Sequence, residues 1–462
     1  MAYGKTIAAI STPSGKGGVA LIRISGDCAK DIAGRIFFPK GRIMPWHSPR
    51  MAIYGDIRHL DEYIDDGVAI YYKAPNSYTG EDTVEITCHG GTLVTRRVLE
   101  AAFMAGATPA GAGEFTERAF INGRLSLAEA EAISDLLEAK SYEQIRLSSL
   151  PMREKLAGAV SKIRDALVGL LSSLFARIDY PDEDLGDFSD GEMKAKLIII
   201  KDDLNALLRT YPTGKAIREG VYTVIAGKCN VGKSTVYNAI LGEDAAIVTD
   251  IEGTTRDVLN STVATGKVLL RLADTAGVRS SDKADTVEKI GIERSIKATK
   301  EAELIIAVFD GSRPYDSDDI RLIELIKNAE AAKIAIINKS DLDLKFDASV
   351  LSNIFDEVIH TSARDNAQNT AALISGAVDA LFTDESITVN DTAIVSSARH
   401  NASLGRTLEF VNAAISAIDS GVYADAAASE IERALGAISE IDGREVSEAV
   451  LADIFSKFCV GK

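Results

Sequence analysis

The stretch that decides the fold is Gly227-Lys228-Cys229-Asn230-Val231-Gly232-Lys233-Ser234. It matches the pattern G-x-x-x-x-G-K-[ST], whose glycines let backbone N–H groups converge on phosphate oxygens. A strand-like apolar run over 221–226 precedes it, and 234–241 can form a helix whose N-terminus attracts anions. The stretch therefore predicts a phosphate-binding loop between a strand and a helix, with Lys233 on the β- and γ-phosphates and Ser234 on Mg²⁺.

Two further motifs extend this site toward the γ-phosphate. The segment Thr249-Asp250-Ile251-Glu252-Gly253-Thr254-Thr255 ends on a threonine that can reach Mg²⁺ and the γ-phosphate. The second motif, Asp274-Thr275-Ala276-Gly277, follows the apolar run 268–272. We expect Asp274 to hold the water shell of the metal and the Gly277 N–H to sense the γ-phosphate.

The last two motifs select the base. Asn338-Lys339-Ser340-Asp341 follows an apolar run, and a carboxylate at Asp341 can accept both N–H groups on the N1/N2 edge of guanine. Adenine lacks that pair of donors, so an ATP-dependent enzyme would require Asp341 to be incidental. Ser362-Ala363-Arg364 follows the run 358–361 and can offer a backbone N–H to guanine O6. Each motif is weak alone, but five in this order predict a domain that binds and hydrolyses GTP.

Two positions bear on the hydrolysis step. Val278 follows the D-x-x-G motif where Ras-like proteins have a glutamine, and an aliphatic side chain cannot orient the attacking water. Carboxylates in the segment 287–293 are candidates for that task. Asn230 occupies the loop position that resembles a K⁺ ligand in potassium-activated GTPases, where a monovalent cation stabilises phosphate charge. Ordinary turn chemistry explains an asparagine there equally well.

The pattern of apolar residues changes along the chain. Short β-type runs alternate with turns over residues 1–120, helical periodicity follows to about residue 210, and strands alternate with amphipathic helices from 221 onward. Helical patterns return over 392–418, 425–438 and 446–458. We therefore expect a multidomain α/β plus all-α protein: an α/β domain (1–120), a helical domain in two halves (121–214 and 385–462), and an inserted Ras-like α/β GTPase domain (215–384), whose chain ends lie close together.

The composition bounds the remaining possibilities. The 462 residues are 46% hydrophobic and 26% charged, with a net charge of −17, which argues against indiscriminate nucleic-acid binding. No apolar run is long enough to span a membrane and the start of the chain resembles no signal or transit peptide, so we expect a cytoplasmic protein. The four cysteines form no C-x-x-C pair and predict neither disulfides nor a zinc site.

The flanking regions resemble the tRNA uridine-modification GTPases of the MnmE (TrmE) family. The resemblance rests on these stretches: Gly17-Gly18-Val19-Ala20-Leu21-Ile22-Arg23-Ile24-Ser25-Gly26, Pro75-Asn76-Ser77-Tyr78-Thr79-Gly80-Glu81-Asp82, Cys88-His89-Gly90-Gly91, Gly113-Glu114-Phe115-Thr116-Glu117-Arg118-Ala119-Phe120, Ile178-Asp179-Tyr180-Pro181-Asp182-Glu183, Ile247-Val248-Thr249-Asp250 and Cys459-Val460-Gly461-Lys462. It covers essentially the whole chain.

The resemblance implies a specific activity. The N-terminal domain is expected to form a homodimer and to bind a tetrahydrofolate derivative of the 5-formyl or methylene type. With a flavoprotein partner, MnmG or GidA, which alone carries FAD, the enzyme is expected to add an aminomethyl or carboxymethylaminomethyl group to C5 of the wobble uridine (position 34) of certain tRNAs. The one-carbon unit comes from the folate, and no membrane is involved.

The resemblance also assigns roles to individual residues. K⁺ is expected at Asn230, Thr249, Ile251 and Thr254, and Mg²⁺ at Ser234 and Thr255. Glu288 matches the catalytic carboxylate that orients water, which answers the question raised by Val278. Further GTP contacts are expected from Val231, Gly232, Lys233, Thr235, Asp250, Glu252, Gly253, Asp274, Thr275, Ala276, Gly277, Asn338, Lys339, Asp341, Ser362, Ala363 and Arg364.

The positions that match the folate site are Arg23, Glu85, Arg124 and Lys462. A carboxylate suits the amide-like edge of a pterin, and Arg or Lys suits the glutamate tail. Cys459 is either a nucleophile toward the pyrimidine C6 or a small half-buried residue. A second hypothesis for the whole chain is a ribosome-assembly or checkpoint GTPase that acts as a timed binding module, although such a protein would favour a basic C-terminal RNA-binding module.

Overall fold

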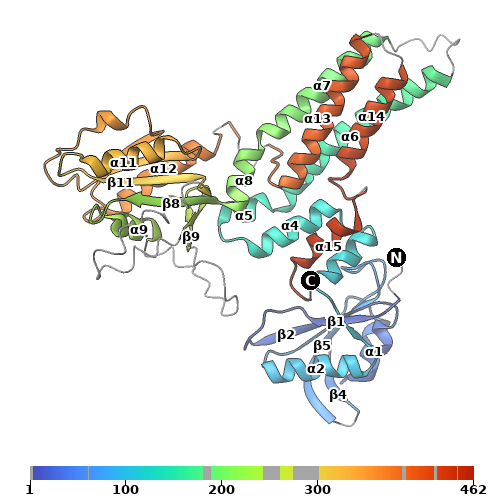
Figure 1. Cartoon of the computed structure of the whole chain (residues 1–462). Helices are drawn as coiled ribbons and strands as arrows, with labels where there is room; N and C mark the ends of the chain where they lie inside the picture. The colour runs from blue at the N-terminus through green and yellow to red at the C-terminus, as the bar shows by residue number, and fades with distance from the viewer. Residues whose placement is uncertain are drawn as a thin grey trace. The chain divides into compact units, whose positions relative to one another are not determined.

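A computed structural model describes residues 4–60, 62–179, 189–242, 261–273, 301–384, 386–387, 392–420, 424–444 and 446–461 (Figure 1). The chain forms two compact units. The first combines Met1–Leu137 with Ile438–Lys462, and the second is Glu138–Ala437. The first unit therefore contains both ends of the chain, and each unit is described by itself below.

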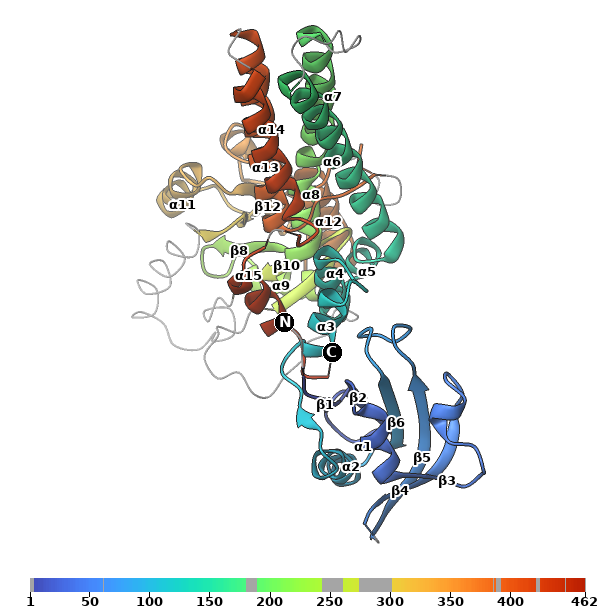
Figure 2. The same cartoon turned by 90° about the vertical axis from the view of Figure 1, so that its right-hand side faces the viewer.

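The first unit is built on a seven-stranded sheet of order β3-β4-β5-β6-β2-β1-β7. Its strands are β1 (Ile7–Ile10), β2 (Val19–Ser25), β3 (Phe37–Pro39), β4 (Ile53–His59), β5 (Glu62–Tyr72), β6 (Thr83–His89) and β7 (Thr108–Pro109). All paired strands are antiparallel except β1 and β7. Helices α1 (Ala29–Ile36) and α2 (Thr92–Met104) cover the same face, as Figure 2 shows, and bury alternate residues of β2 and β6. The short helix η1 (Pro45–His47) packs beside β5.

A smaller helical layer joins the two ends of this unit. Helices α3 (Glu114–Ile121), α4 (Leu127–Glu138) and α15 (Glu448–Ser456) share a core that includes Leu127, Phe455 and Phe458. Beyond α15 the chain pairs with the first unit again: Val460 forms a β-bridge with Ala112. The C-terminal residues are thus fixed against the segment that leads into α3.

The second unit contains a six-stranded sheet of order β13-β12-β11-β8-β10-β9. The strands are β8 (Val221–Gly227), β9 (Ser261–Thr265), β10 (Val268–Leu272), β11 (Leu304–Asp310), β12 (Ala332–Asn338) and β13 (Glu357–His360). Only the β9–β10 pair is antiparallel. Helices α9 (Lys233–Leu241) and α12 (Ala367–Phe382) pack on one face, and α11 (Ser317–Lys327) and η2 (Ala348–Leu351) pack on the other. The predicted parallel sheet with helices on both faces is confirmed.

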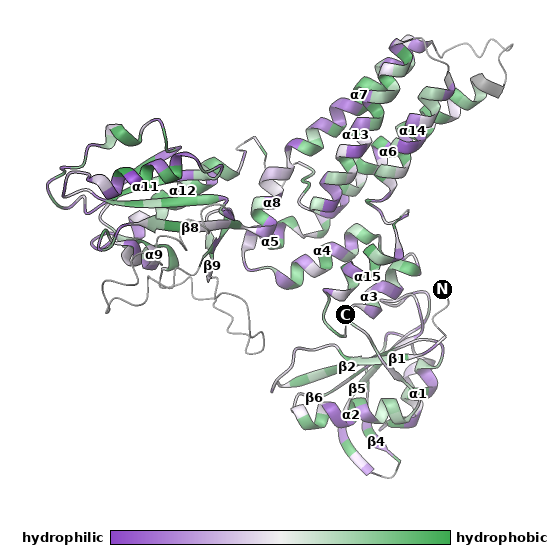
Figure 3. Cartoon of the chain, viewed as in Figure 1, coloured by the Kyte–Doolittle hydropathy of each residue, from purple (hydrophilic) through white to green (hydrophobic). Residues whose placement is uncertain are grey.

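Further helices of the second unit, several of them long, lie outside the sheet and its covering helices (Figure 1). They are α5 (Tyr142–Leu147), α6 (Leu150–Asp179), α7 (Asp190–Arg209), α8 (Tyr211–Glu219), α13 (Ala398–Asp419) and α14 (Ala424–Ser439). Helix α7 packs against both α6 and α13, so segments from before and after the sheet lie side by side. In Figure 3 these helices mix hydrophilic and hydrophobic residues, whereas β11, located from Figure 1, is almost uniformly hydrophobic and is buried along its whole length. Such runs are typical of strands buried on both faces.

The two connections to the inserted sheet are held together. The Thr210 hydroxyl accepts a hydrogen bond from Val395 N at 2.9 Å, and the Thr213 hydroxyl accepts one from Asp384 N at 3.1 Å. The expectation that the chain ends of the insertion lie close together is confirmed. The same contact corrects one predicted boundary: a helix was expected over 392–418, but α13 begins only at Ala398, because the preceding residues run beside α8.

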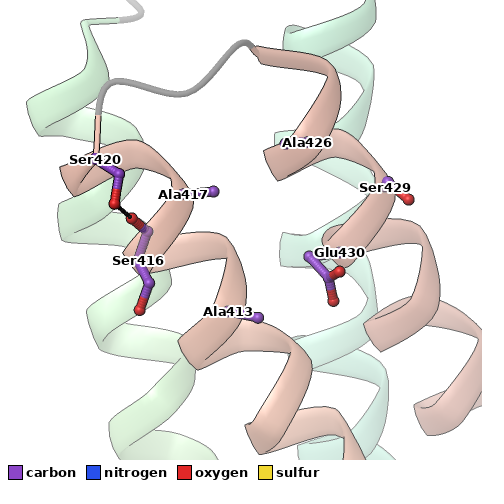
Figure 4. Close-up of a pocket in the computed structure, with 7 residues that line it drawn as sticks. All are labelled: Ala413, Ser416, Ala417, Ser420, Ala426, Ser429 and Glu430. Carbon is purple, nitrogen blue, oxygen red and sulfur yellow. Dashed lines mark hydrogen bonds between the residues drawn. The ribbon is translucent and has the colours of Figure 1, made fainter.

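A shallow hollow of about 560 Å³ lies between α13 and α14 (Figure 4). Small side chains leave this space: it is lined by Ala413, Ser416, Ala417, Ser420, Ala426, Ser429 and Glu430. The Glu430 carboxylate is already paired with Arg433 at 3.0 Å. None of the residues predicted to bind nucleotide, metal or folate lines the hollow. Across the described part of the chain, no helix combines the length and apolar character needed to cross a membrane.

Candidate functional site

The predicted phosphate loop joins the end of β8 to the start of α9, and its backbone requires glycine. Gly227 and Gly232 have φ of 153° and 100°, and Asn230 adopts a left-handed φ of 63°. A Cβ on Gly227 would lie 2.6 Å from Val308 O, and one on Gly232 would lie 2.1 Å from Asn338 Nδ2. Gly232 is also the N-cap of α9, where no side chain caps the helix. The loop therefore presents a helix N-terminus and a glycine-lined backbone, the arrangement that binds phosphate.

Lys233 is oriented by the loop itself. Its Nζ donates to Gly227 O at 2.8 Å and to Lys228 O at 2.6 Å. Burial lowers the pKa of the Lys233 ammonium. The backbone of the loop thus holds the ammonium group in place before any phosphate is bound.

Asn338 joins two of the predicted nucleotide loops. The side chain is 4% exposed, its Nδ2 donates to Val231 O at 2.9 Å, and its Oδ1 accepts from Ala363 N at 3.0 Å. It therefore ties the phosphate loop to the segment 362–364, which follows β13. Both of its polar groups are committed to this structural link.

The remaining base-recognition residues surround this link. Lys339 has a φ of 65°, and its Nζ lies 2.6 Å from Asp310 Oδ2 at the end of β11. Ser340 N donates to Thr361 O at 3.2 Å, which joins the ends of β12 and β13. Asp341 and Arg364 are exposed and Ala363 is buried. Sequence reasoning missed Asp310, although an acidic residue directly after the apolar run 304–309 was a usable signal.

The structure brings together the candidates that it describes in this domain. These are Asn230, Val231, Gly232, Lys233, Ser234, Thr235, Asn338, Lys339, Asp341, Ser362, Ala363 and Arg364, at the carboxyl ends of parallel strands or directly after them. That edge is where open α/β sheets bind ligands. The other predicted residues, Thr249, Asp250, Ile251, Glu252, Gly253, Thr254, Thr255, Asp274, Thr275, Ala276, Gly277, Val278 and Glu288, lie outside the described residues.

Arg23 and Glu85 meet on the first unit's sheet. They are direct cross-strand partners on β2 and β6, and Arg23 Nη2 lies 2.9 Å from Glu85 Oε1. The guanidinium also lies 5.0 Å from the centre of the Tyr78 ring and 5.5 Å from that of Phe115. Its Nη1 is buried and has no hydrogen-bond partner among the described residues. An arginine held this way keeps one N–H group available for an acceptor on a ligand.

Arg124 and the C-terminal residues contact segments that are close in sequence to Tyr78 and Phe115. A Cβ placed on Gly80, two residues after Tyr78, would lie 3.2 Å from Arg124 Cγ, so the Arg124 side chain covers that loop. The exposed Cys459 accepts a hydrogen bond through its carbonyl from Gly113 N at 3.4 Å. Gly461 O accepts one from the Ser11 hydroxyl at 2.8 Å, beyond the end of β1. Lys462 lies outside the described residues.

Comparison with known proteins covers almost the whole chain. Residues 6–124 match the family model of the GTP-binding protein TrmE N-terminus, and residues 127–459 match that of the MnmE helical domain. The tRNA modification GTPase MnmE of Thermotoga sp. (strain RQ2) is 37% identical over 99% of this chain and 100% of its own length. The tRNA modification GTPase MnmE of Clostridioides difficile (strain 630) is 36% identical over 99% of each chain.

A solved structure of Aquifex aeolicus Era bound to GDP·AlF4⁻ is 23% identical and covers 41% of this chain and 66% of that chain, with a TM-score of 0.25. That similarity is too low to support an argument. The matches to MnmE proteins are far stronger, because they extend through the phosphate loop and over 99% or more of the length of the relatives. The chain belongs to the MnmE family of tRNA modification GTPases and is an enzyme that hydrolyses GTP.

Proposed function

We propose that GTP hydrolysis by this chain depends on K⁺ and Mg²⁺ and serves the modification of C5 of the wobble uridine (position 34) in certain tRNAs. The observation that carries the proposal is that one chain, matched to MnmE proteins along its full length, combines a phosphate loop with the Arg23–Glu85 site. The same match favours tRNA modification over a ribosome-assembly role.

In the proposed nucleotide site, Lys233 neutralises the β- and γ-phosphates while Ser234 and Thr255 bind Mg²⁺. Asp341 and a backbone N–H of the segment 362–364 read guanine, while the Ala363 N–H already donates to Asn338 Oδ1. Asn230, with oxygens of Thr249, Ile251 and Thr254, would hold a K⁺ ion, which would supply positive charge beside the phosphates. Glu288 orients the attacking water in place of the glutamine that Val278 replaces. The proposed K⁺ role of Asn230 is supported by its left-handed backbone within a loop built for phosphate.

The K⁺ proposal is tested by GTP turnover in K⁺ and in Na⁺ at equal ionic strength. We expect turnover to be much faster in K⁺, and the Asn230→Ala variant to lose the difference. Asn238→Ala is the matched control, because Asn238 is exposed on α9 away from the loop and its loss should leave the K⁺ effect unchanged. Equal turnover of the wild-type enzyme in both salts would overturn the K⁺ site.

We propose that the first unit binds a tetrahydrofolate derivative, and that Arg23, Glu85, Arg124 and Lys462 are the residues that contact it. The residues fit such a molecule: Glu85 suits the donor edge of a pterin, and the buried Arg23 Nη1 suits one of its acceptors. When bound, the folate supplies the one-carbon unit. Calorimetry with 5-formyltetrahydrofolate tests the site: wild-type binding that Glu85→Gln does not weaken would contradict it.

The proposed reaction requires partners. A flavoprotein of the MnmG type, which carries the FAD, acts together with a homodimer of this chain formed through the N-terminal domain, and the substrate tRNA places the complex in the cytoplasm. Cys459 is a candidate nucleophile toward the uridine.

We also propose the division into residues 1–120, 121–214, 215–384 and 385–462 as functional domains. Nucleoside analysis of tRNA from cells that lack this chain tests the function, and an unchanged wobble-uridine profile would refute it.

A further inference from the structure

We propose that the segment Gly311–Asp316, which carries none of the guanine-nucleotide motifs, braces both nucleotide-binding loops, and that Lys228 and Asp316 are positioning residues for Lys233. The segment lies between the end of β11 and the start of α11. Two sets of contacts connect it, one to the phosphate loop and one to the base-recognition loop. The proposal concerns GTP hydrolysis itself and does not depend on the K⁺ or folate sites.

The first connection runs to the phosphate loop. Lys228 Nζ lies 2.5 Å from Asp316 Oδ2, and the carbonyl of Lys228 accepts a hydrogen bond from Lys233 Nζ at 2.6 Å. The side chain of Lys228 is thus anchored to the N-cap of α11, while its backbone orients the phosphate-binding ammonium. A displacement of Lys228 would therefore move the acceptor that holds Lys233.

The second connection runs to the base-recognition loop. Gly311 N donates to Asn338 O at 2.8 Å, and Asp310, directly before the segment, pairs with Lys339 at 2.6 Å. Arg313 joins the two connections, because its guanidinium lies 4.0 Å from Asp310 Oδ2 and 3.0 Å from Asp316 Oδ2. The ion pairs therefore form one continuous network between Lys228 and Lys339.

A buried acid fixes this network in place. The side chain of Asp319 is 1% exposed; it accepts from Arg313 Nη1 at 3.1 Å and from Asp316 N at 3.1 Å. Asp316 in turn accepts from Asp318 N and Asp319 N, which completes a capping box at the start of α11. The Lys228 ammonium holds the pKa of Asp316 well below its ordinary value, so the carboxylate is charged near neutrality. A charge fixed by a helix cap loses less side-chain entropy on pairing than one on a free surface chain.

The geometry makes a specific set of variants informative. Asp316→Asn keeps an effective N-cap for α11 but removes the charge opposite Lys228. Lys228→Met removes the ammonium and keeps most of the side-chain length, whereas Lys228→Arg keeps the charge. Asp318→Asn is the matched control, because Asp318 is 67% exposed and lies 3.8 Å from Lys228. All variants are made in the full chain.

The measurements are steady-state GTP hydrolysis, the dissociation rate of a fluorescent GDP analogue, and the thermal midpoint. We expect Lys228→Met and Asp316→Asn each to lower kcat/KM and to speed GDP release about fivefold, the upper range for a partly exposed ion pair. Lys228→Arg and Asp318→Asn should remain near wild type, and the thermal midpoint should not move. The double variant should lose less than the sum of the two single variants, because both changes remove the Lys228–Asp316 pair, while Lys228 also lies 3.7 Å from Asp319 and Asp316 also pairs with Arg313.

Three results would overturn the brace. One is additive losses in the double variant, which would mean that the two residues act separately. Another is failure of Lys228→Arg to restore the rates. The third is a change in kcat/KM and GDP release in Asp318→Asn as large as that in Asp316→Asn, which would mean that Asp316 acts only through general surface charge. If Asp316→Asn lowers the thermal midpoint, the comparison of Lys228→Met with Lys228→Arg decides, because both variants keep Asp316 as the N-cap of α11.

Discussion

At the scale of single residues, Asn338 shows how a base-recognition motif can serve the phosphate loop. Its two hydrogen bonds, to Val231 O and from Ala363 N, are buried and span three loops. Removal of the side chain leaves a buried carbonyl and a buried N–H without partners. Such groups cost about 1–3 kcal/mol each, which is a large part of the stability of a domain.

We therefore expect Asn338→Ala to lower the thermal midpoint of the second unit and to raise KM for GTP about tenfold, through about 1.4 kcal/mol of lost loop order. Asn328→Ala is the matched control, since Asn328 Nδ2 makes one exposed bond to Glu324 O. Differential scanning fluorimetry and GTP turnover provide the readouts. Equal midpoints for the two variants would show that the buried bonds contribute nothing.

Asp341 gives a prediction about specificity. The exposed carboxylate is proposed to accept the two N–H groups of guanine, so Asp341→Asn replaces one acceptor with a donor. We expect KM for GTP to rise by about 10- to 100-fold, the range for a lost charge-assisted hydrogen bond, while turnover of xanthosine triphosphate improves, because xanthine carries a carbonyl in place of the 2-amino group. Asp343→Asn, two residues further along the chain, should change neither value. Unaltered GTP selectivity in Asp341→Asn would place guanine recognition elsewhere.

At the scale of elements, the close approach between α8 and the segment before α13 depends on one glycine. A Cβ on Gly214 would lie 2.2 Å from Val395 O, although the backbone conformation there is helical. Glycine is kept at this position in spite of its low helix propensity because the neighbouring backbone leaves no room for a side chain.

We expect Gly214→Ala to lower the stability of the second unit by about 1–3 kcal/mol, since the backbone of α8 or of residue 395 must shift. Gly158→Ala on α6 is the opposite case: nothing lies within 4 Å of the added Cβ, and the residue is exposed. That variant should gain up to about 1 kcal/mol from helix propensity alone. Urea unfolding followed by circular dichroism measures both changes. A stabilised Gly214→Ala protein would contradict the steric argument.

The elements also show how far the sequence reaches. The alternating apolar runs predicted the strands of the inserted sheet and the helices on its two faces, because burial on both faces leaves a clear pattern. Helix α8 was not predicted, because the helical pattern was expected to end at about residue 210. Pro212 instead lies in the first turn of a new helix that begins at Tyr211, directly after α7. The start of α13 was misplaced because a tertiary contact to Thr210, 185 residues away, keeps Val395 out of the helix.

The candidate sites likewise divide into features with a local sequence signal and features that only tertiary contacts produce. Short motifs predicted the phosphate loop, whose glycines are required by local backbone geometry. Arg23 and Glu85 were assigned to one folate site only through family resemblance, and their pairing was not predicted, because a cross-strand register between residues 62 positions apart leaves no local signal. The ring contacts of Tyr78 and Phe115 with Arg23, and the ion pair of Asp310 with Lys339, are purely tertiary and were not predicted.

At the scale of the whole molecule, the ends of the chain complete one unit, and the nucleotide site belongs to the other. Residues 459–461 bond to Gly113, Ala112 and Ser11 of the first unit, while the phosphate loop lies within 138–437. The nucleotide site and the Arg23–Glu85 site therefore belong to different units of the chain. The four cysteines are distributed so that both sites can be followed in one experiment.

Three of these cysteines, Cys28, Cys229 and Cys459, are exposed, while Cys88 is buried. Burial, with a smaller effect of the nearby Asp65 charge, raises the pKa of the Cys88 thiol to about 11. Because only the thiolate reacts with alkylating agents, we expect iodoacetamide at about pH 8 to label the three exposed cysteines and to spare Cys88 until the protein unfolds. Peptide mass spectrometry gives the rate at each position.

Ligands should change these rates selectively. GDP should slow the labelling of Cys229, which lies within the phosphate loop. Because the C-terminal residues are proposed to border the folate site, 5-formyltetrahydrofolate should slow the labelling of Cys459. Cys28, at the N-cap of α1, serves as the internal control in every sample. Protection of Cys28 by either ligand would indicate a general tightening and contradict the assignment of two sites. Protection of Cys229 by GDP without protection of Cys459 by folate would support the nucleotide site and refute the placement of Cys459 beside the folate, because each ligand can shield only the thiol that it covers.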